Sequence, residues 1–119
     1  MKFVVLVGYG KDNVDKATIS LTLARAALEA DEAVSVILVS EGTRLALQGY
    51  ADDLNNGEPF KPLKPLIEEI DQMGAKLHVC MPCLKNRGVD ESDILDNFIK
   101  IAGPDVIAIL KDSERIIQL

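Results

Sequence analysis

Two cysteines, Cys80 and Cys83, form a Cys-x-x-Cys motif, and three kinds of chemistry use this spacing. A zinc site needs four ligands, whereas the chain offers these two thiols and the single histidine His78, so zinc would require ligands shared between subunits. A thioredoxin-like dithiol often carries a proline between its cysteines, as Pro82 stands here, but that motif normally follows the first strand of its fold. The third possibility is a nucleophilic thiolate that carries sulfur as a persulfide.

The residues around the cysteines are basic in a chain that is acidic on average. Between positions 76 and 87 the sequence contains Lys76, His78, Lys85 and Arg87 and no acidic residue, whereas the whole chain has a net charge of −6. Cations close to a thiol stabilise its thiolate, so we expect a lowered cysteine pKa. The competing interpretation is a pair of small buried apolar side chains, and the basic surroundings favour function.

His78 stands two residues before Cys80 and therefore on the same face of the strand predicted for this segment. In that place it can assist proton transfer or stabilise a thiolate anion. A histidine at such a position is more commonly a polar side chain satisfied within the fold, and the sequence favours this second interpretation. His78 remains a candidate site residue on the strength of its spacing.

Hydrophobic periodicity predicts an alternation of strands and helices along the chain. Apolar, β-branched runs predict strands, and apolar residues at helical spacing predict amphipathic helices. The segment 104–111 fits either a strand or a helix, and Pro104 directly after Gly103 favours the helix. We expect strands over 3–7, 34–39, 76–81, 97–102 and 115–119, and helices over 12–31, 43–49, 62–73 and 104–111.

This alternation predicts an α/β fold, a three-layer α/β/α sandwich with a mainly parallel sheet of about five strands, in one domain over 1–119. The carboxyl ends of parallel strands meet at one rim, where ligands and catalysis gather. The loops 8–10, 40–42 and 80–83 should share that rim, with Tyr9 and Arg44 nearby. Segment 76–81 alternates clearly, so we expect one of its faces to meet a cavity or a partner subunit.

Composition excludes several classes of partner. An acidic net charge, 4% aromatic residues and no tryptophan argue against nucleic acid and against an anionic membrane surface. No stretch is long and apolar enough for a signal peptide or a membrane span, so we expect a cytoplasmic protein.

Gly8-x-Gly10 lacks the third glycine of the dinucleotide fingerprint, because Asn13 stands in its place. We expect no cofactor and no metal.

The segment 77–89, with Cys80, Cys83 and the pair Arg87-Gly88, resembles the DsrE/DsrF-like sulfur-relay family, especially its small YchN-like members. The order of the first apolar strand, the long Ala/Leu-rich helix and the last strand is also similar. The resemblance implies a three-layer α/β fold assembled as homotrimers or hexamers. It further implies that Cys80 matches the sulfur-accepting cysteine of the relay proteins, and that Cys83 matches a second cysteine found in part of the family.

These observations lead to a functional hypothesis. We expect a sulfur carrier, or sulfurtransferase, that holds sulfane sulfur as a persulfide on Cys80 and passes it to an acceptor thiol. Cys83 would resolve the persulfide, while Lys85, Arg87 and His78 would stabilise the anion. The expected partners are further copies of the chain and proteins that donate or accept sulfur. Two alternatives remain, a non-catalytic oligomeric binding module and a thiol-disulfide redox protein.

Overall fold

The computed structural model describes residues 1–119 and contains one five-stranded sheet. The strands follow the order β4-β3-β2-β1-β5, and every neighbouring pair is parallel. Parallel strands need a crossover between them, and helices supply these crossovers. The strands are β1 (Lys2–Val7), β2 (Ala33–Leu38), β3 (Lys76–Cys80), β4 (Ile99–Ile101) and β5 (Arg115–Gln118).

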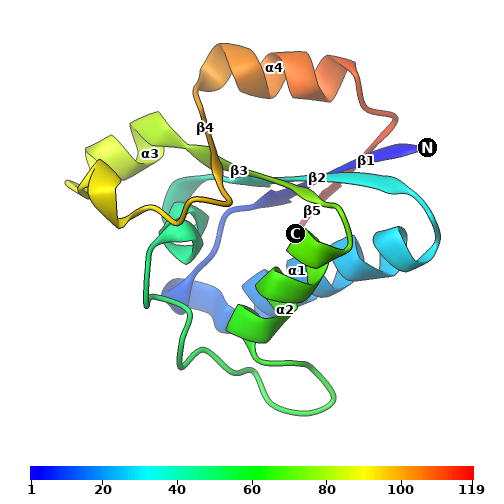
Figure 1. The fold of residues 1–119 in the computed structure, drawn as a ribbon, viewed down its shortest axis with the longest axis horizontal. Coiled ribbons are helices and arrows are strands. Elements are labelled where there is room, and N and C mark those ends of the chain that lie inside the picture. The colour runs from blue at the N-terminus through cyan, green and yellow to red at the C-terminus, as the bar shows by residue number, and fades with distance from the viewer.

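Helices cover both faces of the sheet, so the predicted three-layer α/β/α sandwich is confirmed. Helices α1 and α2 lie on one face and α4 lies on the other (Figure 1). The segment 104–111 is helical, as the Gly103-Pro104 pair favours, with Pro104 in the first turn of α4. The α-helices are α1 (Val14–Glu29), α2 (Leu63–Gln72), α3 (Met81–Asn86) and α4 (Gly103–Lys111), and the 3₁₀ helices are η1 (Lys11–Asn13), η2 (Ser40–Ala46) and η3 (Glu91–Asp93).

The helix predicted over 43–49 is misplaced. The chain instead forms the 3₁₀ helix η2 directly after β2, and this helix ends at Ala46. Leu47 is extended and forms an antiparallel bridge with Ile94, while the Ala46 carbonyl accepts from Leu95 N–H. This pairing with a distant segment competes with helix continuation, and the sequence around 43–49 gives no sign of it.

Local sequence signals account for the two longest helices. Asn13 caps α1, because its side chain accepts a hydrogen bond of 3.0 Å from Lys16 N–H. One stripe of α2 is fully buried, and Gly74, with a φ of 101°, follows the end of that helix. The buried stripe consists of Leu63, Leu66, Ile67 and Ile70.

The two faces of the sheet differ in how much apolar surface they bury. The cluster that includes α1, α2 and the adjacent sheet face contains 22 buried residues. The cluster toward α4 contains three, Val4, Ile37 and Ile101, against which side chains of α4 such as Val106 and Ile109 pack. The α1/α2 face therefore supplies most of the core.

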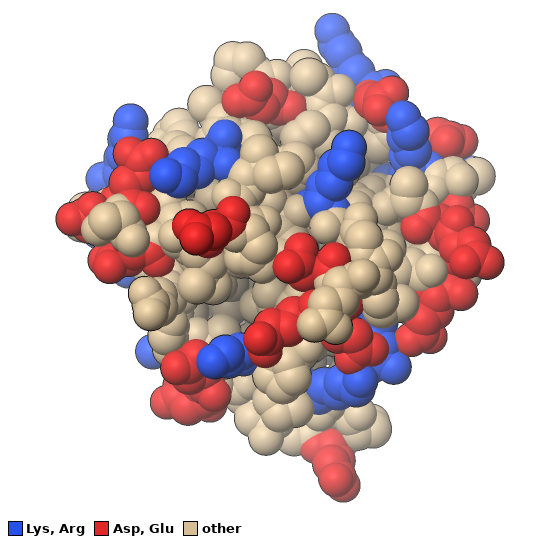
Figure 2. All heavy atoms as spheres, in the orientation of Figure 1, with Lys and Arg blue, Asp and Glu red and all other residues tan.

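The surface mixes charges of both signs. On the face shown in Figure 2, Lys and Arg side chains lie scattered among Asp and Glu. Most ion pairs have at least one exposed partner, and in the pair between Lys2 and Asp112 at 2.7 Å both are exposed, so that it contributes little to stability. None of the helices combines the length and the apolar character needed to cross a bilayer.

Candidate functional site

The two cysteines meet where β3 passes into α3. Cys80 is the last residue of β3, and Cys83 lies in the first turn of the helix that starts at Met81. Both thiols are free, and the Cys83 Sγ donates a hydrogen bond of 3.0 Å to the Cys80 Sγ. Cys80 is only 9% exposed, whereas Cys83 is half-buried. Cys83 is therefore the more accessible of two sulfur atoms that are already in contact.

Burial raises the pKa of the Cys80 thiol, and the adjacent Cys83 thiol raises it further. The lowered pKa expected from the neighbouring cations is therefore wrong for Cys80. The physical reason is that desolvation penalises the thiolate, and no cation contacts the sulfur to offset that cost. Lys85 is exposed and makes no hydrogen bond or ion pair with either cysteine side chain, and the charge of Arg87 is compensated elsewhere.

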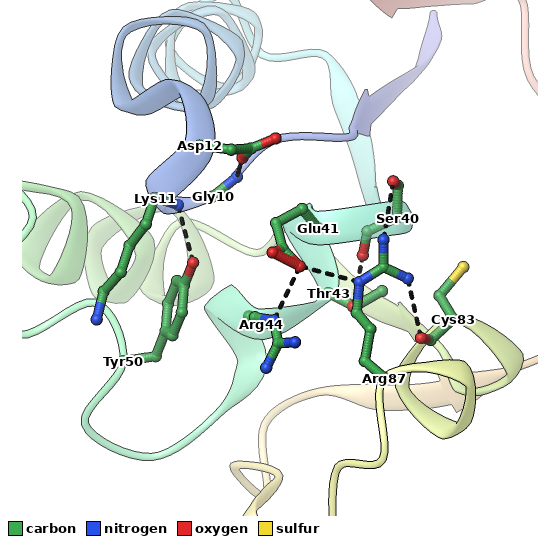
Figure 3. Close-up of polar contacts among 10 residues, drawn as sticks. All are labelled: Gly10, Lys11, Asp12, Ser40, Glu41, Thr43, Arg44, Tyr50, Cys83 and Arg87. Atoms are coloured by element: carbon green, nitrogen blue, oxygen red, sulfur yellow. Dashed lines mark hydrogen bonds and ion pairs between the residues drawn. The ribbon is translucent and has the colours of Figure 1, made fainter.

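Arg87 links the cysteine segment to the loop that follows β2 (Figure 3). Its Nη1 donates to the carbonyl oxygen of Cys83 at 3.1 Å, and its Nη2 donates to the Ser40 Oγ at 3.3 Å. Its Nε pairs with the Glu41 carboxylate at 2.9 Å. The guanidinium thus holds the backbone of the first turn of α3 against the neighbouring loop, and it does so without touching a sulfur atom.

Glu41 is the residue of this site that sequence reasoning missed. Its Oε1 accepts from Arg44 Nε at 2.8 Å and from Arg87 Nε at 2.9 Å. The Arg44 guanidinium, followed by that of Arg87, holds the pKa of the Glu41 carboxyl below its usual value. The segment around the cysteines contains no acidic residue of its own, but the fold places the Glu41 carboxylate beside it, from a loop 46 residues away from Arg87 in the chain. The available signal was the place of Glu41 in the 40–42 loop, which the parallel-sheet argument puts on the same rim.

The three loops expected at one rim do meet there. A Cβ on Gly42 would collide with the carbonyl oxygen of Val7, so only glycine lets the second loop cross the end of β1. In the first loop, a Cβ on Gly10 would lie 3.0 Å from the Glu41 carbonyl oxygen. Ser40 itself has a φ of 52°, in the left-handed region, and its carbonyl accepts from the Thr43 hydroxyl at 2.7 Å. Close backbone packing therefore holds this rim together.

The remaining predicted site residues lie at different distances from the thiols. Arg44 reaches the rim through Glu41, whereas Tyr9 is half-buried beneath Lys16, whose Nζ lies 5.2 Å from the ring centroid. His78 is buried and lines a cavity under α4 to which neither cysteine contributes. Burial, and to a lesser extent Lys76, lowers the pKa of its imidazole, which favours the neutral ring at neutral pH. The structure thus joins Cys80, Cys83 and Arg87 and leaves Lys85 and His78 apart from them.

No three side chains among the His, Cys, Asp and Glu residues come together in a way that could hold a metal ion. The cysteine pair has one buried and one half-buried sulfur, and its nearest charged group is engaged in ion pairing. The two thiols are the nucleophilic groups that the structure brings together at this rim.

Comparison with known proteins gives relatives over almost the whole chain. The uncharacterized protein MJ0989 of Methanocaldococcus jannaschii is 28% identical over 117 residues, which cover 98% of both chains. The uncharacterized protein MK0008 of Methanopyrus kandleri is 28% identical over 109 residues, covering 92% of this chain and 84% of the relative.

Solved structures support the same fold. The crystal structure of the ychN protein from E. coli superposes with a TM-score of 0.82 at 16% identity, covering 100% of this chain and 99% of the other. The protein of unknown function MTH1491 from Methanobacterium thermoautotrophicum gives a TM-score of 0.75 at 15% identity over 99% of this chain and 98% of the other. The sequence profile of the DsrE/DsrF-like family matches residues 1–119 in full. With its all-parallel five-stranded sheet and paired thiols at the end of β3, the chain belongs to the DsrE/DsrF-like family.

Proposed function

We propose that the chain is a cytoplasmic sulfur carrier that holds sulfane sulfur as a persulfide on Cys80. The observation that carries the proposal is the 3.0 Å separation of the Cys80 and Cys83 sulfur atoms at the carboxyl-end rim of a parallel sheet. Membership of the DsrE/DsrF-like family supports it further. The buried Cys80 would hold the sulfane sulfur, and Cys83 would be the thiol of the pair that is more accessible to solvent.

Each step of the proposed transfer moves one sulfur atom between thiolates. The Cys80 thiolate attacks the outer sulfur of a donor persulfide R–S–SH, forming Cys80–S–SH and releasing R–S⁻. An acceptor thiolate R′–S⁻ then attacks the outer sulfur of the Cys80 persulfide, forming R′–S–SH and restoring the Cys80 thiolate. In the absence of an acceptor, the Cys83 thiolate attacks the inner sulfur, which forms the Cys80–Cys83 disulfide and releases HS⁻.

Arg87 acts in this proposal as a positioning residue. Its guanidinium holds the Cys83 carbonyl and so orients the turn on which that thiol stands. The raised pKa of Cys80 makes its thiol a slow nucleophile in the free protein, because only the thiolate attacks. We therefore expect sulfur uptake to become faster as the pH rises from neutral toward the pKa of Cys80.

Intact-mass measurement after incubation with a persulfide donor tests the proposal directly. The two cysteines are the only ones in the chain, so Cys80→Ser and Cys83→Ser are matched variants. We expect an added sulfur of about 32 Da on the wild type and on Cys83→Ser, and none on Cys80→Ser. The adduct should persist longest on Cys83→Ser, because the resolving thiol is missing.

Two results would contradict this assignment. If Cys80→Ser gained as much sulfur as the wild type and Cys83→Ser gained none, the half-buried Cys83 would be the sulfur carrier. No adduct on any of the three proteins, with alkylation showing that the thiols are reduced, would remove the persulfide function altogether.

A thiol-disulfide redox function is the second candidate, and the sulfur contact favours it as well. Sulfur atoms 3.0 Å apart need to move by about 1 Å to reach the length of a disulfide bond. A redox titration distinguishes the two functions. A potential close to that of the cytosolic glutathione pool supports reversible cycling, whereas a pair that stays reduced or stays oxidised throughout that range contradicts it.

We also propose that the chain assembles with further copies of itself, as a trimer or hexamer. A non-catalytic oligomeric binding module would assemble in the same way, so this proposal does not depend on the persulfide function. Large apolar side chains remain exposed on the α4 layer and on the edge strands: Ile99, Ile107, Ile116 and Leu119, with exposures of 43% to 54%. Because β4 and β5 are the opposite edges of the sheet, these side chains would serve separate contacts with different copies of the chain. Light scattering after gel filtration measures the assembly, and a monomer at every concentration tested would contradict it.

A further inference from the structure

A cavity lies between the sheet and the carboxyl-terminal part of α4, away from both cysteines. Its volume is about 330 Å³, which is within the range of small-ligand sites. Half of its lining is apolar and includes Phe3, Val4 and Ile109. The polar lining groups come from the first residues of β1, from β2 and β3, and from the end of α4. This combination of an apolar wall and a few polar groups is the usual composition of a small-molecule site.

His78 is the polar group in this cavity that the fold does not satisfy. Its side chain lines the cavity, the residue is 6% exposed, and neither Nδ1 nor Nε2 has a hydrogen-bond partner. A buried polar group without a partner costs about 1–3 kcal/mol, so such groups in folded proteins usually meet a ligand or an ordered water molecule. Both ring nitrogens are themselves shielded from solvent, so a ligand in the cavity would reach them through a small rotation of the imidazole, which would gain a hydrogen bond that the fold does not supply.

Two further polar side chains lie beside His78 on the same face of the sheet. Ser35 of β2 and Lys76 of β3 are directly paired in the register, and Lys76 precedes His78 by two residues. Both line the cavity. Lys76 has no carboxylate within ion-pair distance, in contrast to Lys2 at the same cavity, which pairs with Asp112 at 2.7 Å. An ammonium, a hydroxyl and an imidazole thus line the same cavity, and the ammonium forms no ion pair, although it acts electrostatically on Asp112.

We propose that this cavity binds a small organic monocarboxylate, with its carboxylate on Lys76, Ser35 and His78 and its apolar body against Phe3 and Ile109. The charge of the site favours a monoanion. Lys2 is paired with Asp112, and Lys76, which acts on Asp112 only at longer range, is the cation of the cavity that forms no ion pair. Asp105 of α4 also acts electrostatically on His78, and its negative charge disfavours a dianion such as phosphate more strongly than a monoanion. The apolar wall would contribute through burial of the ligand body.

Titration of the isotope-labelled protein with benzoate, followed by NMR, tests the site. We expect saturable shift changes confined to residues that line the cavity, together with a change in the imidazole signals of His78. Benzamide has the same shape without the charge, and inorganic phosphate has the charge without the apolar body. Both should bind at least about tenfold more weakly than benzoate.

Three variants connect the binding to the named groups. Lys76→Met changes an exposed residue and should fold normally while weakening benzoate binding by about tenfold or more. His78→Gln should weaken it also, and Lys85→Met, which alters a lysine outside the cavity, should leave it unchanged. Because neither thiol takes part, Cys80→Ser should bind benzoate as the wild type does, so that this test is independent of the persulfide proposal.

Several outcomes would overturn the proposal. They include absence of saturation at millimolar benzoate, shift changes centred outside the cavity, equal binding of benzamide, and unaltered binding by Lys76→Met. A further contrary result would be cavity signals that respond to protein concentration and not to benzoate, because a second copy of the chain would then fill the cavity.

Discussion

The two faces of the sheet differ in how many apolar residues they bury. We refer to the face under α1 and α2 as the dense face and to the face under α4 as the sparse face. The face under α1 and α2 belongs to a cluster of 22 buried residues, whereas the face under α4 buries Val4, Ile37 and Ile101. The cavity lined by His78 and the unpartnered imidazole lie on the α4 face, whereas a larger cavity of about 480 Å³ borders α2 and the end of η2 at the edge of the large cluster. A densely packed face excludes water and leaves no room for an unsatisfied polar group. The apolar packing that stabilises the fold is therefore concentrated on one face of the sheet, and the unpartnered imidazole lies on the other.

The largest expected effect comes from removing side-chain volume on the dense face. Leu66→Ala deletes a side chain that is 1% exposed and should cost about 2–5 kcal/mol of unfolding free energy. Ile109→Ala on the sparse face should cost about 1 kcal/mol, since Ile109 is only partly buried and borders a cavity. Urea denaturation measures both, and equal losses would show that the two faces contribute alike.

Substitutions that enlarge a side chain test the same difference in packing between the two faces of the sheet. Ala24 in α1 is fully buried within the large cluster, so Ala24→Val should cost about 1–3 kcal/mol through overpacking. Ser35→Val introduces the same side chain next to the cavity and should change stability by no more than about 0.5 kcal/mol. Thermal denaturation of the two variants distinguishes them. A large loss in Ser35→Val would mean that the sparse face is as tightly packed as the dense one.

Charged contacts join η2 to α3 at the rim, and these should contribute less than apolar packing. Glu41→Gln removes the carboxylate between Arg44 and Arg87 and should cost about 1 kcal/mol at neutral pH. Because the folded-state pKa of Glu41 lies below its ordinary value of 4.5, this stabilisation is complete above that pH and is lost as the pH falls through the folded-state pKa. Denaturation of both proteins across the acidic range should therefore show the difference shrinking. A constant difference would contradict this account.

The smallest expected effect is the acid sensitivity of the sparse face. The folded-state pKa of His78 lies below its ordinary value of 6.5, so the unfolded chain binds a proton more readily. Stability should therefore decline as the pH falls from 6.5 toward the folded-state pKa, with Lys76 opposing and Asp105 favouring the charged ring. His78→Leu should remove this decline. Melting temperatures in the mildly acidic range provide the measurement, and an unchanged decline in His78→Leu would assign it to other groups.

Much of this architecture is readable from local patterns. The β-branched run 3–7 and the apolar stripe of 62–73 predict β1 and α2 because burial on a sheet or helix face imposes its own period. Polar and apolar residues alternate along 76–81, which predicts that one face of this strand meets a cavity or a partner subunit. Lys76 and His78 of that face do line a cavity. These successes share one cause, which is that each pattern lies within a single element.

The errors concern contacts between segments far apart in the chain. The raised pKa of Cys80 depends on burial at the last residue of β3, and nearby basic residues in the sequence say nothing about that burial. The Glu41–Arg87 pair joins two loops that only the sheet brings together. The end of η2 likewise depends on the bridge from Leu47 to Ile94. Sequence spacing predicts which loops share the rim, but the pairing within the rim is a property of three-dimensional packing.

The left-handed backbone at Ser40 limits which residues can stand at this position. A φ of 52° costs a serine about 1 kcal/mol or more, and glycine would adopt it freely. The Ser40 hydroxyl also accepts an exposed hydrogen bond of 3.3 Å from Arg87, which water would replace in a glycine variant. Position 40 should therefore accept glycine, asparagine and aspartate, which adopt a positive φ readily, and reject β-branched residues although it is exposed in a loop. In a library of random variants, the backbone conformation and not burial should decide which residues are recovered there.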